Sequence, residues 1–241
     1  MRRHAAGLRA ALLVRAWLAC ALASGLAQAV AAAEPAPAGL GTAANATELG
    51  ALLKAGHEPV TLAEQRFERG CQGDVCSMVW QDLVFRAQPG GIRRASGRVL
   101  RLASPADDAK QPLPDLDWEP LAGYQVSVEG RPWGSCFELS HAGLGKSGTA
   151  QRWASVILVP QGRAQAHRFV GYFTGCDALV QTAKPAEVAL PMVSHAAGAA
   201  PGWQVVWQVC GARACRSLPD ARQVQAVAGD PGGALVLSAK Q

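Results

Sequence analysis

The cysteines constrain this 241-residue chain more than any other feature. One of the seven, Cys20, lies in an N-terminal segment with the features of a leader. The remaining six are Cys71, Cys76, Cys136, Cys176, Cys210 and Cys215. An even number of cysteines in an exported protein indicates a framework of disulfides.

The spacing of the cysteines indicates how they pair. A two-residue hairpin loop at Gly73-Asp74 places Cys71 opposite Cys76. The two residues then form a non-hydrogen-bonded pair, in which the side chains are close together. That separation suits a disulfide. Residues 210–215 have the same C-x4-C spacing, although their turn sequence is poorer. These two pairings leave Cys136–Cys176 as the third bond.

Two other uses of the cysteines are open from spacing alone. Four thiolates could bind a metal, but C-x4-C is at the loose end of zinc spacing and an oxidising compartment disfavours free thiolates. In the second alternative, one cysteine pair is redox-active and the chain is a thiol-disulfide oxidoreductase, but the sequence contains no C-x-x-C motif. We predict structural disulfides, with no metal and no cofactor.

The N-terminal segment predicts export. Arg2 and Arg3 precede an apolar stretch over residues 16–30, which ends in small residues before Glu34. This pattern is typical of a secretory signal peptide with cleavage near Ala33. The alternatives are a membrane anchor, which needs about 20 apolar residues, and lipidation of Cys20.

Removal of residues 1–33 changes the charge of the chain. The full sequence carries a formal charge of +5, but four of its 23 basic residues lie in this segment, which has no acidic residue. The mature chain has 19 basic and 18 acidic residues, a net charge of +1. Nucleic-acid binding therefore loses its main support. The composition, with Asn45 as the single Asn, indicates a GC-rich bacterial genome. In a bacterium, the signal peptide predicts a periplasmic or secreted protein with no integral membrane span in the mature chain.

The organisation after the leader is that of one β-rich domain. We expect a flexible linker over residues 34–44 and the domain over 45–241, with weak signs of two related halves, 45–130 and 131–241. A short helix begins at Asn45 or Thr47 and ends at Gly56. Strands are predicted at 77–86, 97–103, 123–129, 134–141, 153–160, 166–174, 187–193, 203–210, 213–217, 223–228 and 233–239.

The fold class follows from the pattern within these strands. Residues 123–129 alternate between apolar and polar, which predicts a sheet with one face buried and the other exposed to solvent. Residues 153–160 are apolar on both faces and are predicted to be central. Many short strands with Gly- and Pro-rich turns predict an antiparallel β-sandwich or barrel-like sheet with one short N-terminal helix, stabilised by disulfides.

Two charged stretches adjoin each other. Five arginines occur between residues 86 and 101, and the acidic, Pro-rich residues 104–120 are predicted to be a surface loop. Mutual neutralisation is the simplest interpretation. The alternative is that the arginines bind an anionic ligand such as a cell-envelope polymer.

A Gly-rich stretch, residues 143–148, contains Lys146 and Ser147. It resembles part of a phosphate-binding loop, but Ser140 stands where that loop needs Gly and a strand follows instead of a helix. Nucleotide binding is therefore excluded, and a small anion or a partner's carboxylate remains a possible ligand.

A hydrolase is the main enzymatic alternative. His141 ends the predicted strand that carries Cys136, and His167 lies on the strand that leads to Cys176. A Ser–His–acid set with Ser147 and either Asp177 or Glu138 can therefore be drawn. No G-x-S-x-G elbow supports this set, and histidines that are solvated or lie at a sheet edge are the simpler interpretation.

The leading hypothesis is a non-enzymatic exported protein that binds an envelope protein or polymer, of which an inhibitor-like scaffold is one form. Trp118 and Trp133 stand beside Pro and Gly in turns, where rings reach the surface and anchor partners. The predicted binding residues are Trp118, Trp133, His141, Lys146, Ser147, Arg152 and His167.

Overall fold

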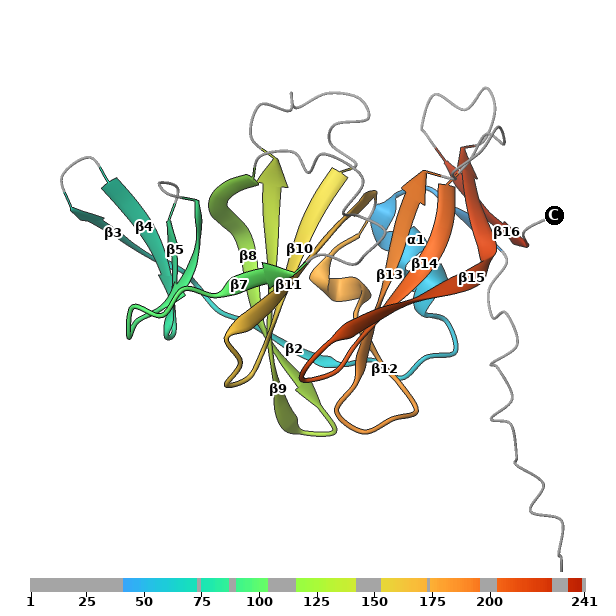
Figure 1. Ribbon diagram of the computed structural model, residues 1–241. Coiled ribbons are helices and arrows are strands. Elements are labelled where there is room, and N and C mark those ends of the chain that lie inside the picture. The colour runs from blue at the N-terminus through green and yellow to red at the C-terminus, as the bar shows by residue number, and fades with distance from the viewer. Residues whose placement is uncertain are drawn as a thin grey trace, which may run out of the picture. The chain divides into compact units, whose positions relative to one another are not determined.

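The computed structural model describes residues 41–72, 75–86, 90–103, 116–141, 153–172, 174–195, 203–226 and 234–239. Strands make up 66% of the structure, and neighbouring strands are antiparallel with the exception of one short pair (Figure 1). The prediction of a mainly β, antiparallel, disulfide-stabilised protein with one short helix is confirmed.

The larger of two sheets contains twelve strands. They are β1 (Gly41–Ala43), β2 (Thr61–Glu64), β7 (Arg101–Ala103), β8 (Leu116–Val128), β9 (Arg131–His141), β10 (Trp153–Pro160), β11 (Gln165–Tyr172), β12 (Val180–Gln181), β13 (Val188–His195), β14 (Trp203–Cys210), β15 (Cys215–Ala226) and β16 (Leu235–Ala239). Their order is β1-β16-β15-β14-β13-β11-β10-β9-β8-β2, with β12 beside β13 and β7 parallel to β11.

The smaller sheet has four strands in sequence order. They are β3 (Glu68–Gln72), β4 (Val75–Trp80), β5 (Leu83–Arg86) and β6 (Gly91–Arg94). Two helical elements complete the described fold, α1 (Ala46–Lys54) and the 3₁₀ turn η3 (Cys176–Ala178).

The helix forms where its capping sequence predicts it. The side chain of Asn45 accepts a hydrogen bond from the Glu48 backbone N–H at 2.9 Å, and the Glu48 carboxylate accepts one from the Ala44 N–H at 2.8 Å. This reciprocal pair satisfies N–H groups that have no partner within the helix. Leu49 and Leu53 are buried against β13–β16.

Strands β8 to β11 form a middle layer because their side chains are apolar on both faces. On one face, Val156 and Leu158 belong to a core shared with β13 and η3. On the other, Ile157 and Val159 belong to a core shared with the four-stranded sheet. The predicted central position of residues 153–160 is therefore confirmed.

Several predicted boundaries are wrong. Residues 77–86 are two strands, because Gln81 and Asp82 turn the chain between β4 and β5. The predicted loop over 104–120 ends earlier, since β8 begins at Leu116 and pairs with β9 despite Pro120. The predicted linker over 34–44 ends in β1, whose backbone pairs with β16. In each case strand pairing determines a conformation that local composition does not specify, and for β1 the partner strand lies at the other end of the chain.

The three predicted disulfides, Cys71–Cys76, Cys136–Cys176 and Cys210–Cys215, are all present. Both hairpin pairs have the expected register, with Cys71 opposite Cys76 and Cys210 opposite Cys215. The third bond joins β9 to η3 inside the core, where both sulfurs are buried. In the described ranges, no helix is both long enough and apolar enough to cross a bilayer.

Candidate functional site: a polar cleft beside the four-stranded sheet

The floor of the candidate site is a row of residues across three strands. Gln125 in β8 is paired with Ser135 in β9, which is paired with Val159 in β10. Paired residues in antiparallel strands point to the same face. Because Val159 belongs to the core beneath the four-stranded sheet, Gln125 and Ser135 lie on that face too.

The four-stranded sheet covers the neighbouring row of this face. The rings of Trp80 and Phe137 meet edge to face with centroids 4.9 Å apart. Gly123 permits this approach, because a Cβ there would lie 2.8 Å from the Phe67 ring and 3.0 Å from Trp80 Nε1. The apolar row is thus buried, and the polar row of Ser135 lies in a cleft at the margin of the contact.

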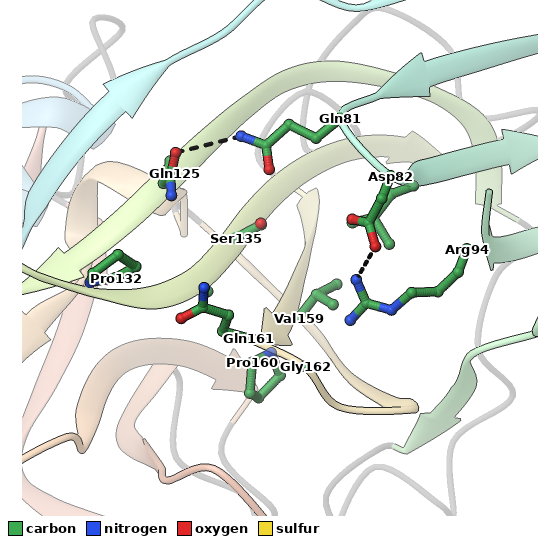
Figure 2. A pocket seen from close by; sticks show the side chains of 12 residues that line it. Gln81, Asp82, Arg94, Gln125, Pro132, Ser135, Val159, Pro160, Gln161 and Gly162 are labelled. Carbon is green, nitrogen blue, oxygen red and sulfur yellow. Dashed lines mark hydrogen bonds and ion pairs between the residues drawn. The ribbon is translucent and has the colours of Figure 1, made fainter. Parts of the chain in front are cut away.

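The cleft has a volume of about 290 Å³. Figure 2 shows the side chains of Gln125, Gln161, Asp82 and Arg94 around the Ser135 hydroxyl. Apolar lining comes from Leu83, Val159, Pro132 and Pro160. A small concave site with apolar walls and a few convergent polar groups is the usual form of a ligand pocket.

One wall is the turn between β4 and β5, which an amide cluster holds in place. Gln81 has a φ of 52°, in the left-handed region that a residue with a Cβ seldom occupies. Its Nε2 donates to Gln65 Oε1 at 2.8 Å and to Gln125 Oε1 at 3.3 Å. A positive φ is usual at the first residue of a two-residue hairpin loop, and the amide contacts hold this turn beside the cleft.

The charges of the cleft compensate each other. Asp82 and Arg94 are the charged lining residues, and they form an ion pair. Arg94 also donates from Nη2 to the Arg163 carbonyl at 2.9 Å, which fixes the guanidinium. The site is therefore polar without a net charge.

The opposite wall is the turn from β10 to β11, with Gln161 and Gly162. Gly134 brings β9 close to this turn, because a Cβ at residue 134 would lie 2.3 Å from the Val159 carbonyl oxygen. The Gln161 N–H donates to the Trp133 carbonyl at 2.9 Å and fixes the turn. The Gln161 side chain is exposed and points into the cleft (Figure 2).

The cleft offers hydrogen-bonding groups, and the one carboxylate among its lining residues, Asp82, is paired with Arg94. None of its twelve lining residues is His, Cys, Lys or Glu, so the Ser135 hydroxyl has no imidazole among them to act as a base. In the described part of the chain, the Gln125 amide N–H₂ and the Gln81 amide oxygen have no hydrogen-bond partner. This arrangement is suited to holding a polar group in place.

A second polar cluster lies on β14 and β15. Trp207 Nε1 donates to Asp220 at 2.6 Å, and Arg222 Nη2 donates to the same carboxylate at 2.7 Å. Burial raises the pKa of Asp220, but the bonds from Arg222 and Trp207 outweigh it, so the pKa lies below its usual range. His57 packs on the Trp207 ring with centroids 4.7 Å apart. These contacts are internal and indicate a structural role.

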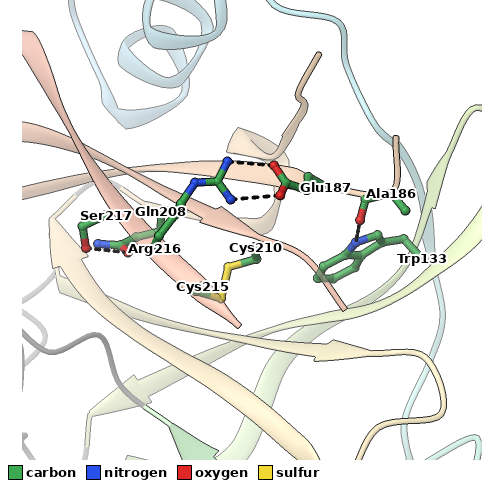
Figure 3. The surroundings of a disulfide bond; sticks show 8 residues. All are labelled: Trp133, Ala186, Glu187, Gln208, Cys210, Cys215, Arg216 and Ser217. Carbon is green, nitrogen blue, oxygen red and sulfur yellow. Dashed lines mark hydrogen bonds and ion pairs between the residues drawn. A yellow bond between two sulfur atoms is a disulfide. The ribbon is translucent and has the colours of Figure 1, made fainter. Parts of the chain in front are cut away.

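The predicted binding tryptophans occupy other environments than expected. Trp133 is 7% exposed, and its Nε1 donates to the Ala186 carbonyl at 3.0 Å (Figure 3). The expectation that its ring reaches the surface is wrong, because Trp133 belongs to strand β9 and its side chain packs in the core. Trp118 is half-buried and packs against the core beneath the four-stranded sheet.

The predicted histidines lie in one sheet, His141 at the end of β9 and His167 in β11. His167 is 4% exposed, and burial lowers its pKa, so the solvated histidine that we expected is wrong at this position. Lys146, Ser147 and Arg152 lie outside the described residues, so their roles and the hydrolase hypothesis stay predictions.

The residues of the cleft were not identified by sequence reasoning. The alternation in 123–129 places Gln125 on the polar face of its strand, which is the one available signal. Ser135, Gln81 and Arg94 meet through strand register and the packing of two sheets, which no spacing encodes. Within the described ranges, no group of three or more His, Cys, Asp and Glu side chains is placed to hold a metal ion.

No protein family, curated protein or solved structure was found to match this chain.

Proposed function

We propose that this chain is an exported, non-enzymatic binding protein that holds a protein or another cell-envelope component in the cleft of Figure 2. One observation carries the proposal: a concave site of amides and one hydroxyl retains unused hydrogen-bonding groups, while its two charges are paired with each other. Such a site takes a neutral group with its own hydroxyls or amides, because an ion would lose water without gaining a counter-charge.

The compartment is part of the same proposal. Three disulfides are typical of proteins that fold in an oxidising compartment. The basic and apolar N-terminal sequence supports export, with cleavage near Ala33. A cell envelope is where a bacterial protein of this kind meets neutral glycans and extended peptides.

A co-sedimentation experiment tests the proposal. Purified, fluorescently labelled protein is mixed with the envelope fraction of the bacterium that makes it. The double variant Gln125→Leu/Ser135→Ala removes two polar groups of the floor. The double variant Gln223→Leu/Ser217→Ala makes the same two changes on β15, away from the cleft.

We expect the cleft variant to lose at least tenfold in apparent affinity, about 1.4 kcal/mol, while the β15 variant binds like the unchanged protein. Equal binding by all three proteins contradicts the assignment of the cleft. Thermal unfolding of both variants, matched to the unchanged protein, excludes misfolding as the cause of a loss.

A further inference from the structure

The four-stranded sheet has a second face, which points away from the core. Its inner residues, among them Trp80 and Phe85, are buried against β8–β10. Alternation along the strands places Val79, Val84 and Arg93 on the opposite side, and these three residues are paired in one row across β4, β5 and β6. We call this the outer face and define it by Glu68, Ser77, Val79, Val84, Arg86, Arg93 and Val99.

The outer face carries three valines. Val79 and Val84 are half-buried neighbours in the row, and Val99 forms a bridge with Arg93 that extends the row by one residue. The Val99 side chain is 66% exposed. Three aliphatic side chains on one exposed sheet face are a surface that a partner can cover with a gain in free energy.

Two arginines, Arg86 and Arg93, lie beside these valines on the outer face. Arg86 pairs with Gly91 in register, so Arg86 and Arg93 are diagonal neighbours on β5 and β6, about 7–8 Å apart by the usual geometry of such pairs. Neither forms an ion pair or a hydrogen bond in the described part of the chain, and Arg86 Nε is shielded from solvent without an acceptor. Both guanidinium groups retain their bidentate donor sets.

The acidic residue of the same face does not neutralise them. Glu68 stands at the far end of the row of Arg93, on β3. Three strand spacings separate the two residues, about 14 Å. That separation exceeds the Debye length of about 8 Å at physiological ionic strength, so salt weakens their attraction.

We propose that the outer face binds an acidic, aliphatic segment of a partner protein. Carboxylates of the segment occupy the guanidinium groups of Arg86 and Arg93, and its aliphatic side chains cover Val79, Val84 and Val99. A polyanionic glycan satisfies the charges but leaves the valines exposed, so the combination favours a peptide. The surface lies on the opposite side of the sheet from Leu83 and Arg94, which line the cleft, and the proposal is independent of the cleft.

The test uses a defined probe, a fluorescein-labelled peptide of six Glu-Val repeats, and measures fluorescence anisotropy with the full chain. We expect binding that weakens as salt is raised and that falls on the order of tenfold in Arg86→Gln/Arg93→Gln. If replacement of the half-buried Arg86 disturbs folding, the single variant Arg93→Glu tests the proposal instead, because it reverses one of the two positive charges. The matched control is Arg131→Gln/Arg213→Gln, which removes two exposed arginines elsewhere and should leave binding unchanged.

Four results overturn the proposal. They are the absence of binding, an equal loss in the Arg131/Arg213 control, equal binding of poly-glutamate or dextran sulfate, and binding that occurs only after Asp107, Asp108 and Asp115 are changed to Asn. The third result makes the face a general polyanion site. The fourth assigns it to the acidic segment of the chain itself.

Discussion

The Glu138 carboxylate accepts a hydrogen bond of 2.7 Å from the backbone N–H of Cys176, whose sulfur is joined to Cys136 on the same strand as Glu138. One carboxylate and one disulfide therefore hold η3 against β9. Burial raises the pKa of Glu138, against the lowering effect of this hydrogen bond, and the nearby Asp177 carboxylate raises it further.

The variant Glu138→Gln should gain stability relative to the unchanged protein as the pH rises. The folded-state pKa of Glu138 lies above its unfolded value, so its favourable contribution is present at low pH and is lost as the carboxyl ionises. An amide oxygen still accepts from the Cys176 N–H and carries no charge. Urea unfolding at pH 4 and pH 7 measures the difference, and a variant that is relatively less stable at pH 7 than at pH 4 contradicts this account.

His167 should make the protein less stable as the pH falls below about 6.5. Burial lowers its pKa in the folded state, so the unfolded chain binds a proton first, and stability decreases as the pH falls through the unfolded value toward the folded one. His167→Gln should reduce the dependence of the unfolding midpoint on pH between 7.5 and 5.5. A residual slope is expected from His57, whose pKa is lowered by burial and by Arg222. An unchanged slope refutes the role of His167.

Two ion pairs of the same chemistry should differ in importance. Arg222–Asp220 has both side chains buried, at 5% and 8% exposure, whereas Arg216–Glu187 has its arginine 46% exposed (Figure 3). Asp220→Asn removes the carboxylate that pairs with the buried Arg222 guanidinium and should cost about 3 kcal/mol. Glu187→Gln is the matched control and should cost less than about 1 kcal/mol. Similar losses of unfolding free energy for both variants contradict the prediction.

The disulfides should also contribute unequally. Cys136–Cys176 closes a sequence separation of 40 residues and each hairpin bond one of 5. Loop-closure entropy predicts a loss of about 4 kcal/mol when Cys136 and Cys176 are changed to Ala, and about 2 kcal/mol for the Cys71/Cys76 double variant. Denaturant unfolding of the two double variants compares these values, and an equal loss would falsify the entropic explanation.

The sequence identifies the parts of this structure that depend on short-range rules. The pairing of the two hairpin disulfides follows from strand register within six residues and leaves Cys136–Cys176 as the third bond. The Asn45 cap follows from two neighbouring side chains. Trp133 shows where such rules stop, because a turn sequence indicates an exposed ring, but the ring is buried and its Nε1 donates to the Ala186 carbonyl, far along the chain. The cleft is of the same kind, since Gln81 and Ser135 meet through the packing of two sheets.

Photo-crosslinking at the rim of the cleft tests the central claim most directly. A photoreactive amino acid replaces Gln161, whose exposed side chain points into the cleft, or the exposed Gln225 of β15 as a control. Irradiation in the presence of the envelope fraction should give a crosslinked product from position 161 that is lost when Gln125→Leu/Ser135→Ala is added. A product of equal yield from both positions, or one that survives the floor variant, contradicts the claim that this cleft binds an envelope component.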